Sequence, residues 1–210
     1  MTLRIANAAG FWGDQPSAAR QLVEASTVDY LTLEYLAELT MSILARLREK
    51  DPQAGYATDF IDVLHSLKSL WPDQPQLKII TNAGGMNPLA CATKAAELLA
   101  EHQLGALPVG VVTGDDLLPR IADLLRTGQE FINLDTGAPL SSLTQPIVSA
   151  NAYLGARPIA SALDQGARLV ITGRVADASL TVGPAMHAFQ TNWTNWDALA
   201  AYSVAGHLIE

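Results

Sequence analysis

Short apolar runs alternate along the chain with longer segments in which apolar residues recur at helical spacing. The runs predict strands within residues 3–8, 28–35, 77–85, 107–116, 145–155 and 168–173. Helical spacing, with capping and stop residues, predicts helices within 16–26, 36–50, 55–72, 87–105, 117–128, 158–167, 179–189 and 195–210. The best strands are apolar throughout, which is typical of parallel strands buried on both faces. The pattern predicts an α/β fold, a layered and mostly parallel Rossmann-like sheet with helices on both faces.

The chain is expected to form one domain. No repeat, low-complexity tract or linker interrupts its 210 residues, of which 49% are hydrophobic and 16% charged, as in globular proteins. We therefore expect a single α/β domain over residues 1–210. The last predicted helix keeps its helical spacing at Ile209 and Glu210, without a glycine or proline to stop it. This suggests the N-terminal portion of a longer protein.

The composition of the chain limits the kinds of partner and compartment that we expect for it. It has 21 acidic and 13 basic residues, a net charge of -8, and no lysine- or arginine-rich run of the kind that binds a phosphate backbone. It has no apolar run long enough for a membrane span. Cys91 is the single cysteine, so an intramolecular disulfide is excluded and a reducing compartment is favoured. We expect a cytoplasmic protein with a small-molecule partner, no nucleic acid and no membrane; a homo-oligomer is compatible with the sequence.

Polar residues and glycines recur directly after the predicted strands. In an open parallel sheet, ligands bind beyond the carboxyl ends of the strands. The expected binding residues at this edge are Asn7, Gly10, Asp14, Glu34, Asn82, Gly84, Gly85, Asn151, Tyr153 and Ser179. The expected catalytic residues are Asp115, Asp116, Arg174 and Asp177. Together they predict a polar site at one edge of the sheet.

The double glycine of NAGGMNP, residues 82–88, has two interpretations. Glycines there can bring backbone N–H groups close to an anion, and the helix that begins beyond Asn87 adds a favourable dipole. The alternative is a tight turn from strand to helix, in which Asn87 caps the helix and Pro88 is its first residue.

The acidic and basic candidates also have structural alternatives. Asp115 and Asp116 could bind Mg²⁺ or act as a general base, or one of them could cap a helix. Arg174 follows a buried strand and could bind a carboxylate or phosphate through two hydrogen bonds, with Asp177 as an orienting group or base. The alternative is an internal ion pair between Arg174 and Asp177.

The standard cofactor motifs are missing from the sequence. It contains neither G-x-G-x-x-G nor G-x-x-x-x-G-K-[ST], so the nucleotide fingerprint is non-standard and the cofactor is unknown. No spacing of cysteines and histidines predicts a zinc site, and we assign no metal ligand. The G-x-S-x-G elbow of serine hydrolases is missing too.

Several segments in order resemble the N-terminal domain of the acyclic terpene utilisation (AtuA-like) family. They include RIANAAGFWGD, DYLTLEYLAELTMSILAR, IITNAGGMNP, GDDLLPR, NLDTG and LVITGRVADASLTVGP, and the resemblance runs from Arg4 to Glu210. It implies a role in the breakdown of citronellol and geraniol, which proceeds through CoA thioesters of branched acids. CoA as part of the substrate is therefore implied by the resemblance, which supplies no catalytic residues.

From these observations we expect a catabolic enzyme that acts on a branched-chain acid or its CoA thioester. A lyase or hydratase step is the natural choice, because it needs only positioned acids and bases. Two alternatives stay open: a non-catalytic ligand-binding or scaffold subunit of the same pathway, and a nucleotide-using enzyme with an unusual phosphate loop. Turnover by the isolated protein separates the first alternative from an enzyme.

Overall fold

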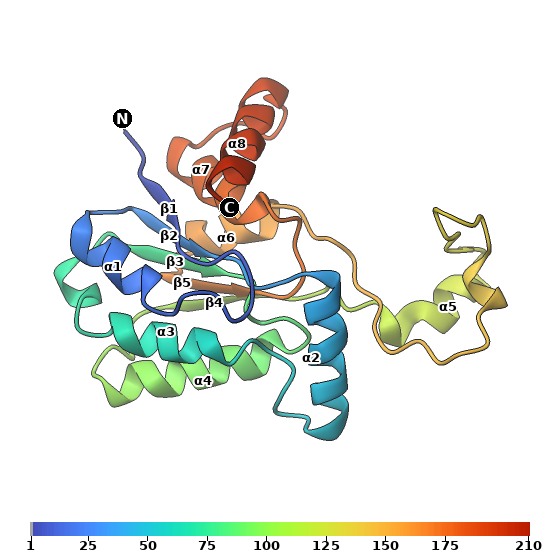
Figure 1. Cartoon of the computed structure of the whole chain (residues 1–210). Coiled ribbons are helices and arrows are strands. Elements are labelled where there is room, and N and C mark those ends of the chain that lie inside the picture. The colour runs from blue at the N-terminus through green and yellow to red at the C-terminus, as the bar shows by residue number, and fades with distance from the viewer. Residues whose placement is uncertain (1) are drawn as a thin grey trace.

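One parallel sheet of five strands forms the centre of the molecule in the computed structural model, which describes residues 2–210 (Figure 1). Its strands, in spatial order, are β1 (Ile5–Asn7), β2 (Tyr30–Leu33), β3 (Lys78–Thr81), β5 (Leu169–Thr172) and β4 (Val109–Val112). Every neighbouring pair is parallel. The expected layered α/β architecture is confirmed.

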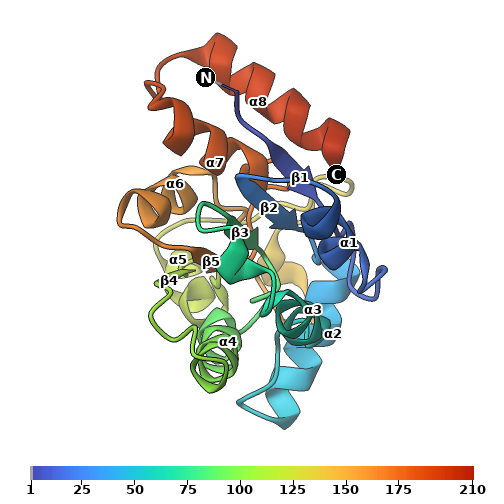
Figure 2. The same cartoon turned by 90° about the vertical axis from the view of Figure 1, so that its left-hand side faces the viewer.

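Helices cover both faces of this sheet (Figure 2). One face packs against α1 (Ala18–Ala25), α2 (Glu38–Lys50), α3 (Asp59–Leu67) and α4 (Pro88–Glu101). The other packs against α6 (Arg157–Asp164) and α7 (Ser179–Phe189), and α8 (Trp196–Ile209) lies outside α7. Along β3 the side chain of Ile79 enters the first core and that of Ile80 the second. Burial on both sides explains why the central strands β2, β3 and β5 are mainly apolar.

The expected strand within residues 145–155 is wrong. These residues form no strand; Asn151 makes a single bridge to Asp116, and Leu154 makes one to Val175. The short apolar run gave a strand-like pattern, but its partners lie in turns beyond the carboxyl ends of β4 and β5. The segment therefore crosses the sheet edge instead of extending the sheet.

Along the chain, an arm that includes residues 118–142 lies between β4 and this crossing segment. It contains α5 (Ile121–Arg126) and the 3₁₀ turns Leu118–Arg120 and Leu140–Ser142, and it extends away from the sheet (Figure 1). A third 3₁₀ turn, Trp71–Asp73, precedes β3. Within residues 2–210, no helix combines the length and the apolar character that a membrane crossing requires.

The chain leaves β3 and β5 toward opposite faces of the sheet. β3 continues into α4 on one face, whereas its neighbour β5 continues into α7 on the other. In doubly wound sheets, the crevice that binds ligands opens between two such strands. The topology thus places the residues after Thr81 and after Thr172 at this crevice.

Cys91 is expected to be inert toward thiol reagents in the native protein. Its side chain is on the buried face of α4, and burial raises the pKa of the thiol to about 12. Since the thiolate is the reactive form, labelling should require unfolding. Native protein mixed with an aromatic disulfide reagent should stay unlabelled, whereas protein in denaturant should label fully. Rapid labelling of folded protein would contradict the packing of α4.

Candidate functional site

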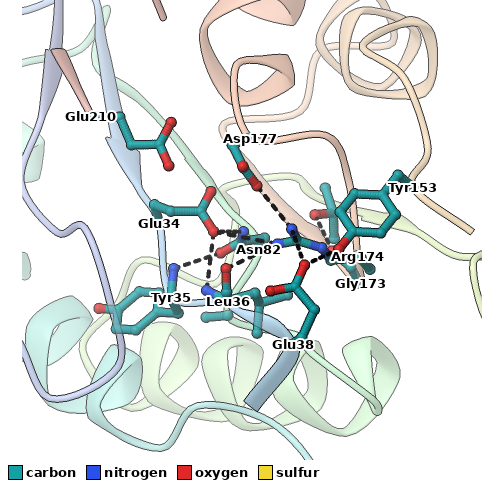
Figure 3. A network of polar contacts seen from close by, with 12 residues as sticks. Glu34, Tyr35, Leu36, Glu38, Asn82, Tyr153, Gly173, Arg174, Asp177 and Glu210 are labelled. Atoms are coloured by element: carbon teal, nitrogen blue, oxygen red, sulfur yellow. Dashed lines mark hydrogen bonds and ion pairs between the residues drawn. The ribbon is translucent and has the colours of Figure 1, made fainter. Parts of the chain in front are cut away.

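Arg174 is the centre of a polar network at the carboxyl edge of the sheet (Figure 3). Its side chain is buried and donates from Nη1 to the Leu36 carbonyl at 2.9 Å. Its Nη2 lies 3.1 Å from Asp177 Oδ1 and 3.8 Å from Glu38 Oε1. The Tyr153 ring covers the guanidinium, with Cζ 4.2 Å from the ring centroid. The internal Arg174–Asp177 pair is therefore present, which leaves few donors of Arg174 free for a substrate anion.

Glu34 lies behind this arginine, directly after β2. Its Oε1 accepts hydrogen bonds from the Asn82 side chain and from Leu36 N, and lies 4.0 Å from Arg174 Nη1. Asn82 in turn accepts from Tyr35 N at 2.8 Å, so its orientation is fixed. Burial raises the pKa of Glu34 to about 7, and the nearby carboxylate of Asp177 adds to this effect. A carboxyl group with such a pKa can exchange a proton near neutral pH.

Asp177 and Glu210 approach Glu34 from the other side of the network (Figure 3). One oxygen from each of the three carboxyl groups lies within 4.8 Å of the others. They line a small cavity of about 10 Å³. Burial and the Asp177 carboxylate raise the pKa of Glu210.

A much larger cavity, of about 620 Å³, opens on the far side of Asp177. Asp177, Tyr153, Ser179 and His207 provide polar atoms in its wall, which is otherwise formed mainly by apolar residues. The apolar part includes Pro158, Ala178, Val182, Trp193, Trp196 and Leu199. Asp177 lines both cavities, whereas Glu34 lines only the small one. Asp177 therefore lies between the buried carboxyl group of Glu34 and the open pocket.

The double glycine is explained by packing. A Cβ on Gly84 would lie 2.5 Å from the Thr172 carbonyl and 2.8 Å from Pro88 Cα, both backbone atoms. Gly85 has a φ of 50°, and its N–H already donates to the Asn82 carbonyl at 3.0 Å. The pair lets the β3–α4 turn press against the end of β5. An anion bound by these glycines stays a prediction.

Asp115 and Asp116 form a second group, which makes no ion pair with the Arg174 guanidinium. Buried Asp115 accepts from Arg174 N at 2.8 Å and from Asn151 Nδ2 at 2.9 Å, and so ties the ends of β4 and β5 to the crossing segment. Asp116 pairs with Arg48 at 3.0 Å and accepts from Leu118 N at 3.0 Å, so it stabilises the turn before the 3₁₀ turn Leu118–Arg120. The residue at the N-cap of that turn is Leu117, and neither aspartate is a helix cap. With Gly85 they line a separate cavity of about 190 Å³.

The remaining predicted residues lie around the end of β1. Asn7 donates to Ala9 O and accepts from Thr32 Oγ1, each at 3.0 Å, and it lines the small cavity. Asp14 accepts from Gly10 N at 2.9 Å, a bond that lowers the pKa of Asp14. Gly10 and Asp14 thus close their own loop and do not reach Arg174.

Sequence reasoning missed Glu38 and Glu210. Glu38 is the first residue of α2 and accepts a hydrogen bond from the Tyr153 hydroxyl, which lowers the pKa of Glu38 and raises that of Tyr153. Its place at the start of a helix that directly follows a strand was the available signal. Glu210 had no local signal, because its place at the site depends on how α8 packs on α7.

Replacing Glu34 by glutamine should change how stability depends on pH. The folded-state pKa of about 7 exceeds the ordinary value of 4.5, so protonated Glu34 favours folding below about pH 4.5, and this contribution is lost as the pH rises through 7. In a buffer that contains a metal chelator, the free energy of unfolding of wild type should fall by on the order of 3 kcal/mol relative to that of Glu34→Gln as the pH rises from 4.5 through 7. Urea denaturation at several pH values measures the difference. Parallel pH profiles would contradict the raised pKa.

Of three comparisons with known proteins, one identifies a family. Searches among curated proteins and among solved structures found no match. The family model described as "Acyclic terpene utilisation family protein AtuA" matches residues 3–210. Since this match covers nearly the whole chain, the chain belongs to the AtuA family of acyclic terpene utilisation proteins.

Proposed function

We propose that the chain is an enzyme of acyclic terpene utilisation that acts on a branched-chain acid or its CoA thioester. The observation that carries the proposal is the junction at Asp177, where an ionisable network meets a largely apolar cavity of about 620 Å³. A cavity of this size and lining suits a branched hydrocarbon chain. The carboxylate supplies a base at its polar end.

The reaction proposed is the addition of water to a carbon–carbon double bond next to the carbonyl, or its reverse. Asp177 accepts a proton from water as the oxygen bonds to the β-carbon, and the same proton then passes to the α-carbon. Arg174 keeps Asp177 oriented through their 3.1 Å contact. Glu34 lies behind Asp177, with one oxygen of each carboxyl group within 4.8 Å of the other.

Arg157 is the best candidate for binding the anionic part of the substrate. It lines the large cavity with its guanidinium 5.1 Å from the Trp193 ring centroid, and its side chain is in none of the ion pairs formed by residues 2–210. Arg174 is already engaged by acidic side chains. An exposed arginine beside an apolar cavity suits a carboxylate or a CoA phosphate.

Thermal-shift and calorimetric titrations with citronellyl-CoA, citronellic acid, free CoA, ATP and NAD test the substrate class. A ligand that binds the native state raises its melting temperature. Ser203→Phe, which fills the cavity, should abolish the shift with the branched ligand, and Ala201→Phe, on the exposed side of α8, should leave it unchanged. A shift with ATP or NAD but with none of the CoA compounds would support a nucleotide-using enzyme instead.

A further inference from the structure

Glu34 Oε2 is a buried carboxylate oxygen without a hydrogen-bond partner among residues 2–210. Glu34 is 2% exposed, and its other oxygen is bound by Asn82 and Leu36. Such a group is costly to bury, so an unpaired buried oxygen calls for an explanation. The free oxygen faces the small cavity that Asp177 and Glu210 also line (Figure 3).

We propose that Glu34, Asp177 and Glu210 bind a divalent cation of the Mg²⁺ or Mn²⁺ class. The available donors are carboxylate oxygens, which hard cations prefer. One oxygen from each residue lies within 4.8 Å of the others, and opposite ligands of an octahedral Mg²⁺ are about 4.2 Å apart. Small shifts of these three side chains would therefore bring their oxygens to the distances that an octahedral cation requires.

The charges of the network favour a cation. Glu34, Glu38, Asp177 and Glu210 all lie near a single guanidinium, that of Arg174. His207 Nδ1 lies 3.7 Å from Glu210 Oε2 and adds a positive charge only when it is protonated. Glu38, on the other side of Arg174, is outside the small cavity (Figure 3). A cation between the ionised forms of the other three carboxyl groups offsets their negative charge and gives Glu34 Oε2 its partner.

The packing of α8 on α7 fixes the position of Glu210, the third carboxyl group of the site. Gly206 of α8 is buried against α7, where a Cβ would lie 3.0 Å from Ala178 Cβ and 3.1 Å from its Cα. Glu210 N then donates to the Gly206 carbonyl at 3.2 Å. This close helix contact directs Glu210 toward Glu34, so the site joins the ends of β2 and α8 and the start of α7.

Titration of chelator-stripped protein with Mn²⁺, followed by electron paramagnetic resonance and calorimetry, tests the site. Wild type should bind one Mn²⁺, and Mg²⁺ should compete for it. Glu34→Gln and Glu210→Gln should each weaken binding more than about tenfold, since even residues that only support metal ligands have effects of that size. Glu38→Gln removes the same charge from outside the cavity and should weaken binding much less than either of these variants.

The Glu34→Gln side chain keeps an oxygen for the Asn82 and Leu36 hydrogen bonds, so this variant should fold, as circular dichroism will show. Failure of wild type to bind Mn²⁺ or Mg²⁺ would overturn the site, as would unchanged binding by Glu34→Gln. The titration contains no organic ligand, so its result is independent of the substrate experiments with citronellyl-CoA.

Discussion

Replacing Arg174 by alanine is expected to destabilise the protein by roughly 3–5 kcal/mol, because removing one partner of a buried ion pair leaves the other charge uncompensated. Arg174 is 4% exposed and is the guanidinium nearest to Glu34 and Asp177. Its loss also removes the donor to the Leu36 carbonyl and the cation beneath the Tyr153 ring. Urea denaturation near neutral pH measures the loss.

The surface pair of Arg126 and Asp123 is a matched control. These residues are also three positions apart and 3.1 Å from each other, but their side chains are 77% and 74% exposed. Arg126→Ala should therefore cost less than about 1 kcal/mol. The double variant Arg174→Ala/Glu34→Gln should recover part of the loss, because one of the uncompensated charges is gone. Equal costs for the two single arginine variants would contradict a buried, charge-balanced network.

Gly84→Ala is expected to lower the free energy of unfolding by about 3 kcal/mol, near the upper end of the cost of overpacking a tight core. The added methyl group would meet the Thr172 carbonyl at 2.5 Å and Pro88 Cβ at 2.7 Å. The first belongs to β5 and the second to the start of α4, so neither yields by a simple rotation. The turn would have to move away from β5.

Gly155→Ala is the control for this substitution, since a Cβ there meets no atom within 4 Å. It should change stability by less than about 0.5 kcal/mol, as is usual for surface positions. Thermal and urea denaturation of both variants provide the comparison. A Gly84→Ala protein as stable as wild type would show that the double glycine is not needed for packing, and would favour the anion-binding interpretation.

Local signals were sufficient for most of the fold. The start of α4 is an example: Asn87 accepts from Ala90 N at 3.3 Å and Pro88 is the first helical residue, as the sequence predicts. The position of β5 between β3 and β4 had no such signal. β5 pairs with β3 although α4, β4, α5 and α6 lie between them in the chain, so this position is a property of the assembled sheet.

The sequence predicted only part of the candidate site, because local signals identify strand ends but not which side chains meet in the folded chain. Strand ends gave Glu34, Asn82, Arg174 and Asp177, which the fold does bring together (Figure 3). They also gave Asp115, whose carboxylate instead binds Arg174 N and the Asn151 side chain and so stabilises the turn. Residue type and position do not distinguish these roles, because the difference lies in which backbone donors each carboxylate meets.

The residues that line the large cavity could not be predicted from local sequence patterns. Trp193, Trp196 and Leu199 come from α8 and the loop before it, whereas Pro158 and Val182 come from α6 and α7. Arg157 was not singled out, because an arginine at the start of a helix is ordinary in a sequence. Its significance comes from the apolar surface beside it.

Turnover tests the central claim, that acid–base chemistry takes place where Asp177 meets the cavity. The measurement is loss of the conjugated thioester absorbance when 3-methylcrotonyl-CoA or geranyl-CoA is mixed with the protein, with and without Mg²⁺. Wild type should hydrate at least one of these compounds, and Asp177→Asn should be slower by about 100-fold or more. Binding of the thioesters without hydration by wild type would contradict the claim and favour a binding subunit.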